Sequence, residues 1–290
     1  MSKRFRRFDL RKTLFLLPNL ITLSAVFCGF DSIRRSATAQ NEDDFYRASL
    51  LIIFAMFFDM LDGRVARLTK TQSAFGLQID SLADIVSFGV APSLLVFRWT
   101  LHRFDLFGLV AAFLFTACGA IRLARFNVLS MDEAGKPTKP SKYIVGLPIP
   151  GAAGILVSIV VANHAVAGAI GREEYAWAIM AVTIALGALM VSTVRFRSFK
   201  DIRLNVRTVL FVAFAIGSSA LISAHMKPAF VLVWLLGFYV MVGIFETLWS
   251  LSGRLRRVVR GEVLARDSAA PPPPRRPGAP GGGTGREGRP

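Results

Sequence analysis

Cysteine and histidine are scarce in this sequence of 290 residues, and each scarcity argues against a class of protein. The two cysteines, Cys28 and Cys118, both fall inside long apolar runs, which argues against a disulfide framework. The three histidines, His102, His164 and His225, lie away from the aspartates discussed below, which argues against a zinc site. No small-residue cleavage site closes the first apolar run, so we expect a retained helix and not a signal peptide.

Long apolar runs dominate the chain, since 53% of its residues are hydrophobic and its mean hydropathy is +0.49. A helix needs roughly 20 mostly apolar residues to cross a bilayer. We therefore predict an all-α polytopic membrane protein. The predicted spans lie near residues 14–30, 46–66, 76–97, 104–124, 144–166, 175–194, 206–224 and 228–249.

Charge is unevenly placed along the chain, which has 35 Lys and Arg against 19 Asp and Glu and a net charge of +16. If the predicted spans alternate across a membrane, most of the basic residues fall on the side that holds both termini. This pattern indicates that both termini are cytosolic. It also makes membrane lipids, and not nucleic acid, the expected partner of the basic surface. We expect an integral protein of a bacterial plasma membrane with its chemistry on the cytosolic side.

Four segments are predicted from composition. Residues 1–13 form a basic amphipathic segment for the membrane surface, or alternatively a simple topology signal. Residues 14–200 form a catalytic transmembrane core, and residues 201–250 add about two transmembrane helices. Residues 251–290 form a basic tail, rich in Pro and Gly, that cannot bury enough apolar surface to fold. No soluble domain is left, so we expect the chemistry in the membrane or at its surface.

Four aspartates, Asp59, Asp62, Asp80 and Asp84, stand at the ends of two apolar runs. An ionised carboxylate in a membrane is costly and marks a functional site by default. The first pair is spaced i, i+3 and the second i, i+4, so each pair projects from one face of its helix. A short turn between the helices lets all four converge, and so many acids require a cation.

Carboxylate ligands without nearby His or Cys favour Mg²⁺, Mn²⁺ or Ca²⁺. Such ions assist displacement at phosphorus, and Arg67 could pair with a phosphate. One alternative is a structural cluster in which Arg64 and Arg67 pair with the aspartates. Another is a divalent-cation transporter, although its acids should be spread through the depth of the membrane.

The spacing of these residues forms a longer pattern. It reads Asp59-x2-Asp62-Gly63-x2-Ala66-Arg67-x8-Gly76-x3-Asp80-x3-Asp84. This pattern resembles the signature of the CDP-alcohol phosphotransferases. The resemblance implies a core of six transmembrane helices, usually homodimeric, that binds two Mg²⁺ or Mn²⁺ ions.

The same resemblance implies roles for individual residues. Asp59, Asp62 and Asp80 are expected to bind metal, and Asp84 to bind metal and to serve as the catalytic general base. A further set is expected to line the CDP-lipid. This set comprises Asn19, Thr22, Gly63, Arg67, Ser73 and Gly76.

Four other stretches resemble the branch of the family that uses serine. They are residues 87–92, 122–127 and 146–151, and residues 190–192 leading to 195–201. The branch implies transfer of phosphatidyl from CDP-diacylglycerol to L-serine, with release of CMP. Arg122, Arg125 and Asn127 are candidates for serine binding, or alternatively basic anchors at a membrane surface. Glycerol 3-phosphate and inositol phosphate remain alternative acceptors.

Overall fold

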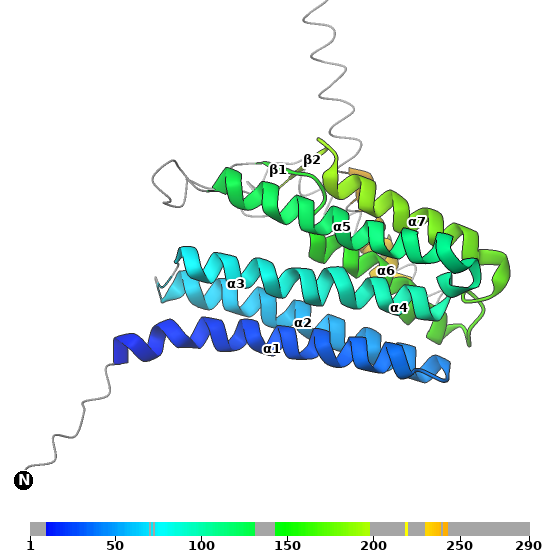
Figure 1. Ribbon diagram of the computed structural model, residues 1–290, viewed down its shortest axis with the longest axis horizontal. Helices are drawn as coiled ribbons and strands as arrows, with labels where there is room; N and C mark the ends of the chain where they lie inside the picture. The colour runs from blue at the N-terminus through cyan, green and yellow to red at the C-terminus, as the bar shows by residue number, and fades with distance from the viewer. Residues whose placement is uncertain are drawn as a thin grey trace, which may run out of the picture. The chain divides into compact units, whose positions relative to one another are not determined.

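The computed structural model describes residues 10–69, 71, 73–130, 143–197, 218–219, 230–238 and 240–242. Helices form almost all of this part, which confirms the all-α prediction for the chain (Figure 1). The helices are α1 (Leu10–Thr38), α2 (Glu42–Leu68), α3 (Ala74–Asp84), α4 (Ala91–Trp99), α5 (Asp105–Ser130), α6 (Ile149–Ala165) and α7 (Glu173–Val191).

Helices α1 and α2 form an antiparallel hairpin that carries the first half of the aspartate motif (Figure 1). Asn41 starts α2 because its side chain accepts a hydrogen bond from the Asp44 amide at 3.0 Å, which satisfies a free donor of the first turn. Buried Ala48, Ile52 and Ala55 recur on one face of α2, and the Ser32 hydroxyl of α1 donates to the Ala48 carbonyl at 2.9 Å. Small residues on this face allow the two helices to pack closely.

Helices α3 and α4 are joined without a break by a π-helical segment, η1 (Ile85–Val90), which begins directly after Asp84. Its contact with α1 is close, because a Cβ atom on Gly29 would lie 2.8 Å from the Ser87 Cα atom. The Ser87 hydroxyl also donates to the Ala25 carbonyl of α1 at 3.1 Å. These contacts fix the position of η1 against α1.

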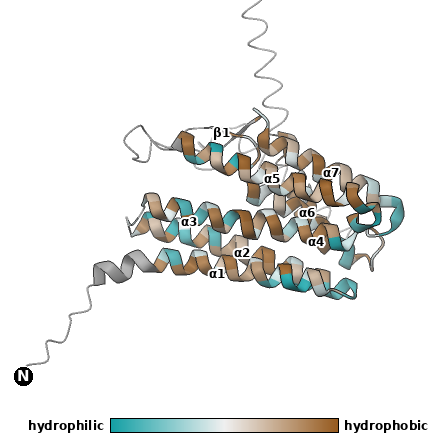
Figure 2. Cartoon of the chain, in the orientation of Figure 1, coloured by the Kyte–Doolittle hydropathy of each residue, from teal (hydrophilic) through white to brown (hydrophobic). Residues whose placement is uncertain are grey.

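Three helical stretches of the described chain are long and apolar enough to cross a membrane. They are Ala74–Trp99, Leu101–Leu129 and Glu173–Val191, and α6 is a shorter apolar helix. Hydrophobic residues predominate along α5, α6 and α7 (Figure 2). The first six predicted spans correspond to α1, α2, the continuous stretch of α3 and α4, α5, α6 and α7. The chain is an integral membrane protein.

A short antiparallel hairpin was not predicted from the sequence. Strand β1 (Tyr143–Val145) pairs with β2 (Arg195–Arg197), with Ile144 opposite Phe196. Gly146 then turns the chain into α6 with a φ of 82°, and a Cβ atom there would meet the Met190 carbonyl oxygen at 2.2 Å. Only glycine fits this turn.

Several predicted segments lie wholly or partly outside the described residues. Residues 1–9 of the amphipathic segment and the whole of the tail, 251–290, are among them. Of the last two predicted spans, residues 218–219, 230–238 and 240–242 are described and helical. Leu236 in this part lies near Gly154 of α6, where a Cβ atom would be 3.1 Å from its side chain.

Candidate metal and phosphotransfer site

Three of the four predicted aspartates meet between α2 and α3. One carboxylate oxygen from each of Asp59, Asp62 and Asp80 lies within 4.8 Å of the other two. Asp62 is buried, and the other two are partly buried. The i, i+3 spacing on α2 and the antiparallel return of α3 bring the three side chains to one place, as the spacing predicted.

Asp84 lies beside this group at the carboxyl end of α3, where its side chain is buried. Asp84 lies close enough to Asp59 and Asp80 to interact with both electrostatically. The Arg122 guanidinium of α5, also buried, is the positive group that acts on Asp84 within the described part of the chain. Arg122 also lies 5.4 Å from the centre of the Phe126 ring, which helps to hold its direction.

Thr22 connects α1 to the aspartates. Its hydroxyl lies 2.5 Å from Asp62 Oδ2 and 3.0 Å from the Pro18 carbonyl oxygen. Thr22 was expected near the nucleotide, and the structure brings it into contact with a carboxylate of the cluster. A hydroxyl donor at this distance orients the Asp62 carboxylate.

Gly63, which follows Asp62 on α2, has open space beside it. A Cβ atom on Gly63 would meet only Arg67 Nη2, at 4.0 Å. Ser73 caps α3 by accepting a hydrogen bond from the Gly76 amide at 3.0 Å, and a Cβ atom on Gly76 would lie 4.0 Å from Asn19 Oδ1. Ser73, Gly76 and Asn19, expected to line the CDP-lipid, thus lie together at the start of α3, where amides favour phosphate. Gly63 and Arg67, expected in the same role, lie on α2.

The donor set fits a hard divalent cation. It consists of carboxylate oxygens, without His or Cys among the three clustered side chains. Mg²⁺ and Mn²⁺ prefer such oxygen ligands, and the ion would offset the repulsion between the acids.

Two of the three candidates for serine binding are engaged elsewhere. Arg125 donates to the carbonyl oxygens of Val191 and Ser192, at 3.1 and 3.4 Å, and so joins α5 to the end of α7. Asn127 donates to Ser81 Oγ at 2.9 Å, which joins α5 to α3. Arg122 is therefore the candidate that lies next to the aspartates.

Stretches that are far apart in the sequence contact α5 or one another near its carboxyl-terminal half. The hairpin of β1 and β2 brings residues 146–151 to residues 190–197, and Arg125 contacts the second of these stretches. Residues 87–92 contain most of η1, where the Thr116 hydroxyl of α5 donates to the Gly89 carbonyl at 3.2 Å. The π-helix was missed by sequence reasoning, although such segments are frequent at functional sites.

Comparison with known proteins agrees with the geometry. The family model for CDP-alcohol phosphatidyltransferase matches residues 15–189. A Helicobacter pylori protein named CDP-diacylglycerol–serine O-phosphatidyltransferase is 37% identical over 238 residues, which cover 82% of this chain and 93% of that protein.

Proteins of the same name from two other organisms are also similar. The one from Bacillus subtilis is 34% identical over 63% of this chain and 91% of its own length. The one from Saccharomyces cerevisiae is 42% identical over 46% of this chain and 49% of its own length. With more than half of its length matched by the family model and its aspartates gathered at one site, the chain belongs to the CDP-alcohol phosphatidyltransferase family.

Proposed function

We propose that the protein transfers the phosphatidyl group of CDP-diacylglycerol to L-serine and releases CMP. The observation that carries this proposal is the meeting of Asp59, Asp62 and Asp80 beside Asp84 and Arg122. The relatives named as serine O-phosphatidyltransferases support the choice of both substrates.

Asp59, Asp62 and Asp80 would hold divalent metal, with Asp84 as a further ligand, and we propose two ions of Mg²⁺ or Mn²⁺. When bound, such ions neutralise phosphate charge and polarise the phosphorus centre. Thr22 acts through Asp62, whose direction it holds by the contact of 2.5 Å. Gly63, Arg67, Ser73, Gly76 and Asn19 surround the space that we assign to the CDP group.

Asp84 is proposed as the general base. It takes the proton from the serine hydroxyl, whose oxygen forms a bond to the phosphorus that carries diacylglycerol. The bond between that phosphorus and the oxygen bridging to CMP breaks, and CMP leaves with the electron pair. Asp84 suits this role by position, because it is buried beside the aspartate cluster and next to Arg122.

Arg122 is proposed to hold the serine carboxylate, since its guanidinium can form two parallel hydrogen bonds to a carboxylate. Arg125 and Asn127 are proposed to position α5, because both side chains bind α7 or α3. The relatives named as serine O-phosphatidyltransferases also favour serine over glycerol 3-phosphate and inositol phosphate.

The proposed organisation has a catalytic core of residues 14–200, additional helices at 201–250, a cytosolic active site and a homodimeric assembly. The distribution of basic residues supports the orientation, and the family resemblance supports the dimer. A reporter fused after residue 250 should be cytosolic, and one inserted near residue 170 should be external. An external carboxyl terminus would contradict the orientation.

The decisive experiment is CMP release by the purified protein supplied with CDP-diacylglycerol and Mg²⁺ or Mn²⁺. L-serine should support release far better than glycerol 3-phosphate, inositol 1-phosphate or inositol. Preference for a phosphorylated acceptor would contradict the serine assignment and leave the reaction class intact. Absence of CMP release with every acceptor would contradict the reaction class.

A further inference from the structure

A groove lies between α1 and α2 at the end of the helices that is opposite the aspartates. It has a volume of about 260 Å³ and is lined by Arg35, Arg47, Leu50, Leu51 and Phe54. Arg47 precedes Asp59 by twelve residues of α2, which corresponds to about 18 Å along a helix. The groove is therefore separate from the proposed phosphotransfer site.

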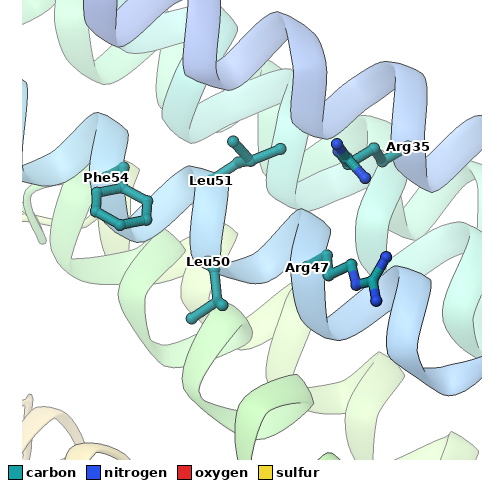
Figure 3. A pocket seen from close by; sticks show the side chains of 5 residues that line it. All are labelled: Arg35, Arg47, Leu50, Leu51 and Phe54. Carbon is teal, nitrogen blue, oxygen red and sulfur yellow. The ribbon is translucent and has the colours of Figure 1, made fainter.

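Figure 3 shows that the two cationic side chains come from neighbouring helices, Arg35 from α1 and Arg47 from α2. The apolar side chains follow Arg47 along α2 at positions i+3, i+4 and i+7, so they share one helix face. Phe54, the last of them, is 56% exposed. The lining thus changes from cationic to apolar along α2, toward the middle of the helix.

Both charged side chains that line the groove are cationic, and no acid among the described residues lines it. Asp31 is bound by Arg34 and by Arg35, whose Nε lies 3.0 Å from Asp31 Oδ2. This contact uses Nε of Arg35 and leaves its terminal nitrogens for other acceptors. Arg47 forms no hydrogen bond or ion pair with any residue that the structure describes.

The three acids at the start of α2 have partners elsewhere. Glu42 accepts a hydrogen bond from Asn163 at 2.6 Å, and Asp43 lies 3.6 Å from His164. Asp44 accepts from the Gln40 amide at 3.1 Å. None of these contacts involves Arg47, and none of the three acids lines the groove.

We propose that this groove binds one anionic phospholipid, with its phosphate between Arg35 and Arg47 and an acyl chain along Leu50, Leu51 and Phe54. Arginine provides planar donors that match phosphate oxygens. Charge complementarity selects the anionic head group, and the apolar face of α2 selects a lipid over free phosphate. Such a lipid would bridge α1 and α2 at the end of the hairpin.

Native mass spectrometry of the purified full-length protein tests this proposal. Dioleoylphosphatidylglycerol should bind in preference to dioleoylphosphatidylcholine. Arg47→Gln should weaken phosphatidylglycerol binding about tenfold, the scale of one hydrogen bond to a charged group. The matched control is Arg98→Gln, which removes an exposed arginine at the end of α4 that does not line the groove. It should leave lipid binding unchanged.

Competition identifies the source of the phosphate. Neither inorganic phosphate nor glycerophosphoglycerol at millimolar concentration should displace the lipid, because neither has an acyl chain. Unchanged lipid affinity in Arg47→Gln, an equal loss in Arg98→Gln, or displacement by inorganic phosphate would overturn the proposal. The proposal would also be overturned if crosslinking showed that a second copy of the chain occupies the groove in place of lipid. An unchanged thermal unfolding temperature verifies that Arg47→Gln is folded.

Discussion

The hydroxyl of Thr22 on α1 lies 2.5 Å from Oδ2 of Asp62 on α2, so the first helix supplies a hydrogen-bond donor to the aspartate cluster. Thr22→Val keeps the shape of the side chain and removes that donor. We expect the metal concentration needed for half-maximal activity to rise at least about tenfold, the scale of a hydrogen bond to a charged group. Metal titration of CMP release measures it.

The matched control is Ser24→Ala, which lies two residues after Thr22 on α1. The Ser24 hydroxyl donates to the Leu20 carbonyl of its own helix at 2.9 Å and is exposed. Its removal should leave the metal requirement unchanged. An equal shift in both variants would show that the effect arises from α1 in general and not from the contact with Asp62.

Metal removal should abolish activity. The carboxylates of Asp59, Asp62 and Asp80 repel one another at their short separation and need a cation to offset their charge. EDTA should therefore stop CMP release, and added Mg²⁺ or Mn²⁺ should restore it. Each of Asp59→Ala, Asp62→Ala and Asp80→Ala should be inactive yet elute as a folded protein. Full activity in one variant would remove that residue from the proposed metal site.

Asp84→Asn separates base catalysis from binding. The amide keeps the size of the side chain and one oxygen but cannot accept the serine proton. We expect turnover to fall at least about 100-fold, the usual scale for loss of a general base. Binding of CDP-diacylglycerol, measured by equilibrium titration, should persist. Near-normal turnover would leave Asp84 as a metal ligand without a base role.

Arg122→Lys and Arg125→Lys should have different effects. Lysine lacks the planar guanidinium, so Arg122→Lys should raise the serine concentration needed for half-maximal rate with little change in thermal unfolding. Arg125→Lys loses two hydrogen bonds to the end of α7 and should lower the unfolding temperature instead. A selective change in serine requirement for Arg125→Lys would reverse the two assignments.

Gly29→Ala tests the packing of α1 against η1. The new Cβ atom would lie 2.7 Å from Ser87 Oγ and 2.8 Å from Ser87 Cα, so the helices must move apart. Overpacking of this kind costs about 1–3 kcal/mol and should lower the thermal unfolding temperature. Gly151→Ala is the control, because its Cβ atom would lie 3.9 Å from Leu147 Cδ1. Equal unfolding temperatures for the wild type and Gly29→Ala would contradict the contact.

The aspartate cluster could be predicted because it depends on local geometry. Helical spacing places Asp59 beside Asp62, and the antiparallel return of α3 adds Asp80. The apolar runs likewise predicted the helices, since their lengths are set by the bilayer. Contacts between distant segments could not be predicted in this way.

Two side-chain contacts depend on how distant helices pack together. The pairing of Thr22 with Asp62 depends on how α1 is rotated about its axis, which its own sequence does not determine. The direction of Arg125 depends on the position of the end of α7, so serine binding and a structural role could not be separated beforehand. The strands β1 and β2 were not predicted because each has only three residues, too few to show an alternating pattern.

The π-helical segment η1 also determines how this region tolerates insertions and deletions. Each residue of an α-helix turns the chain by about 100°, and a π-helical turn accommodates one residue more than an α-helical turn. Deletion of one residue within Ile85–Val90 could restore regular α-helix locally. The direction in which α4 faces relative to Asp84 would then stay nearly the same, and Leu95 and Trp99 would remain buried. Insertion of one more residue into a regular helix there would instead rotate all of α4 by about 100° relative to Asp84, so this region should accept a deletion more readily than an insertion.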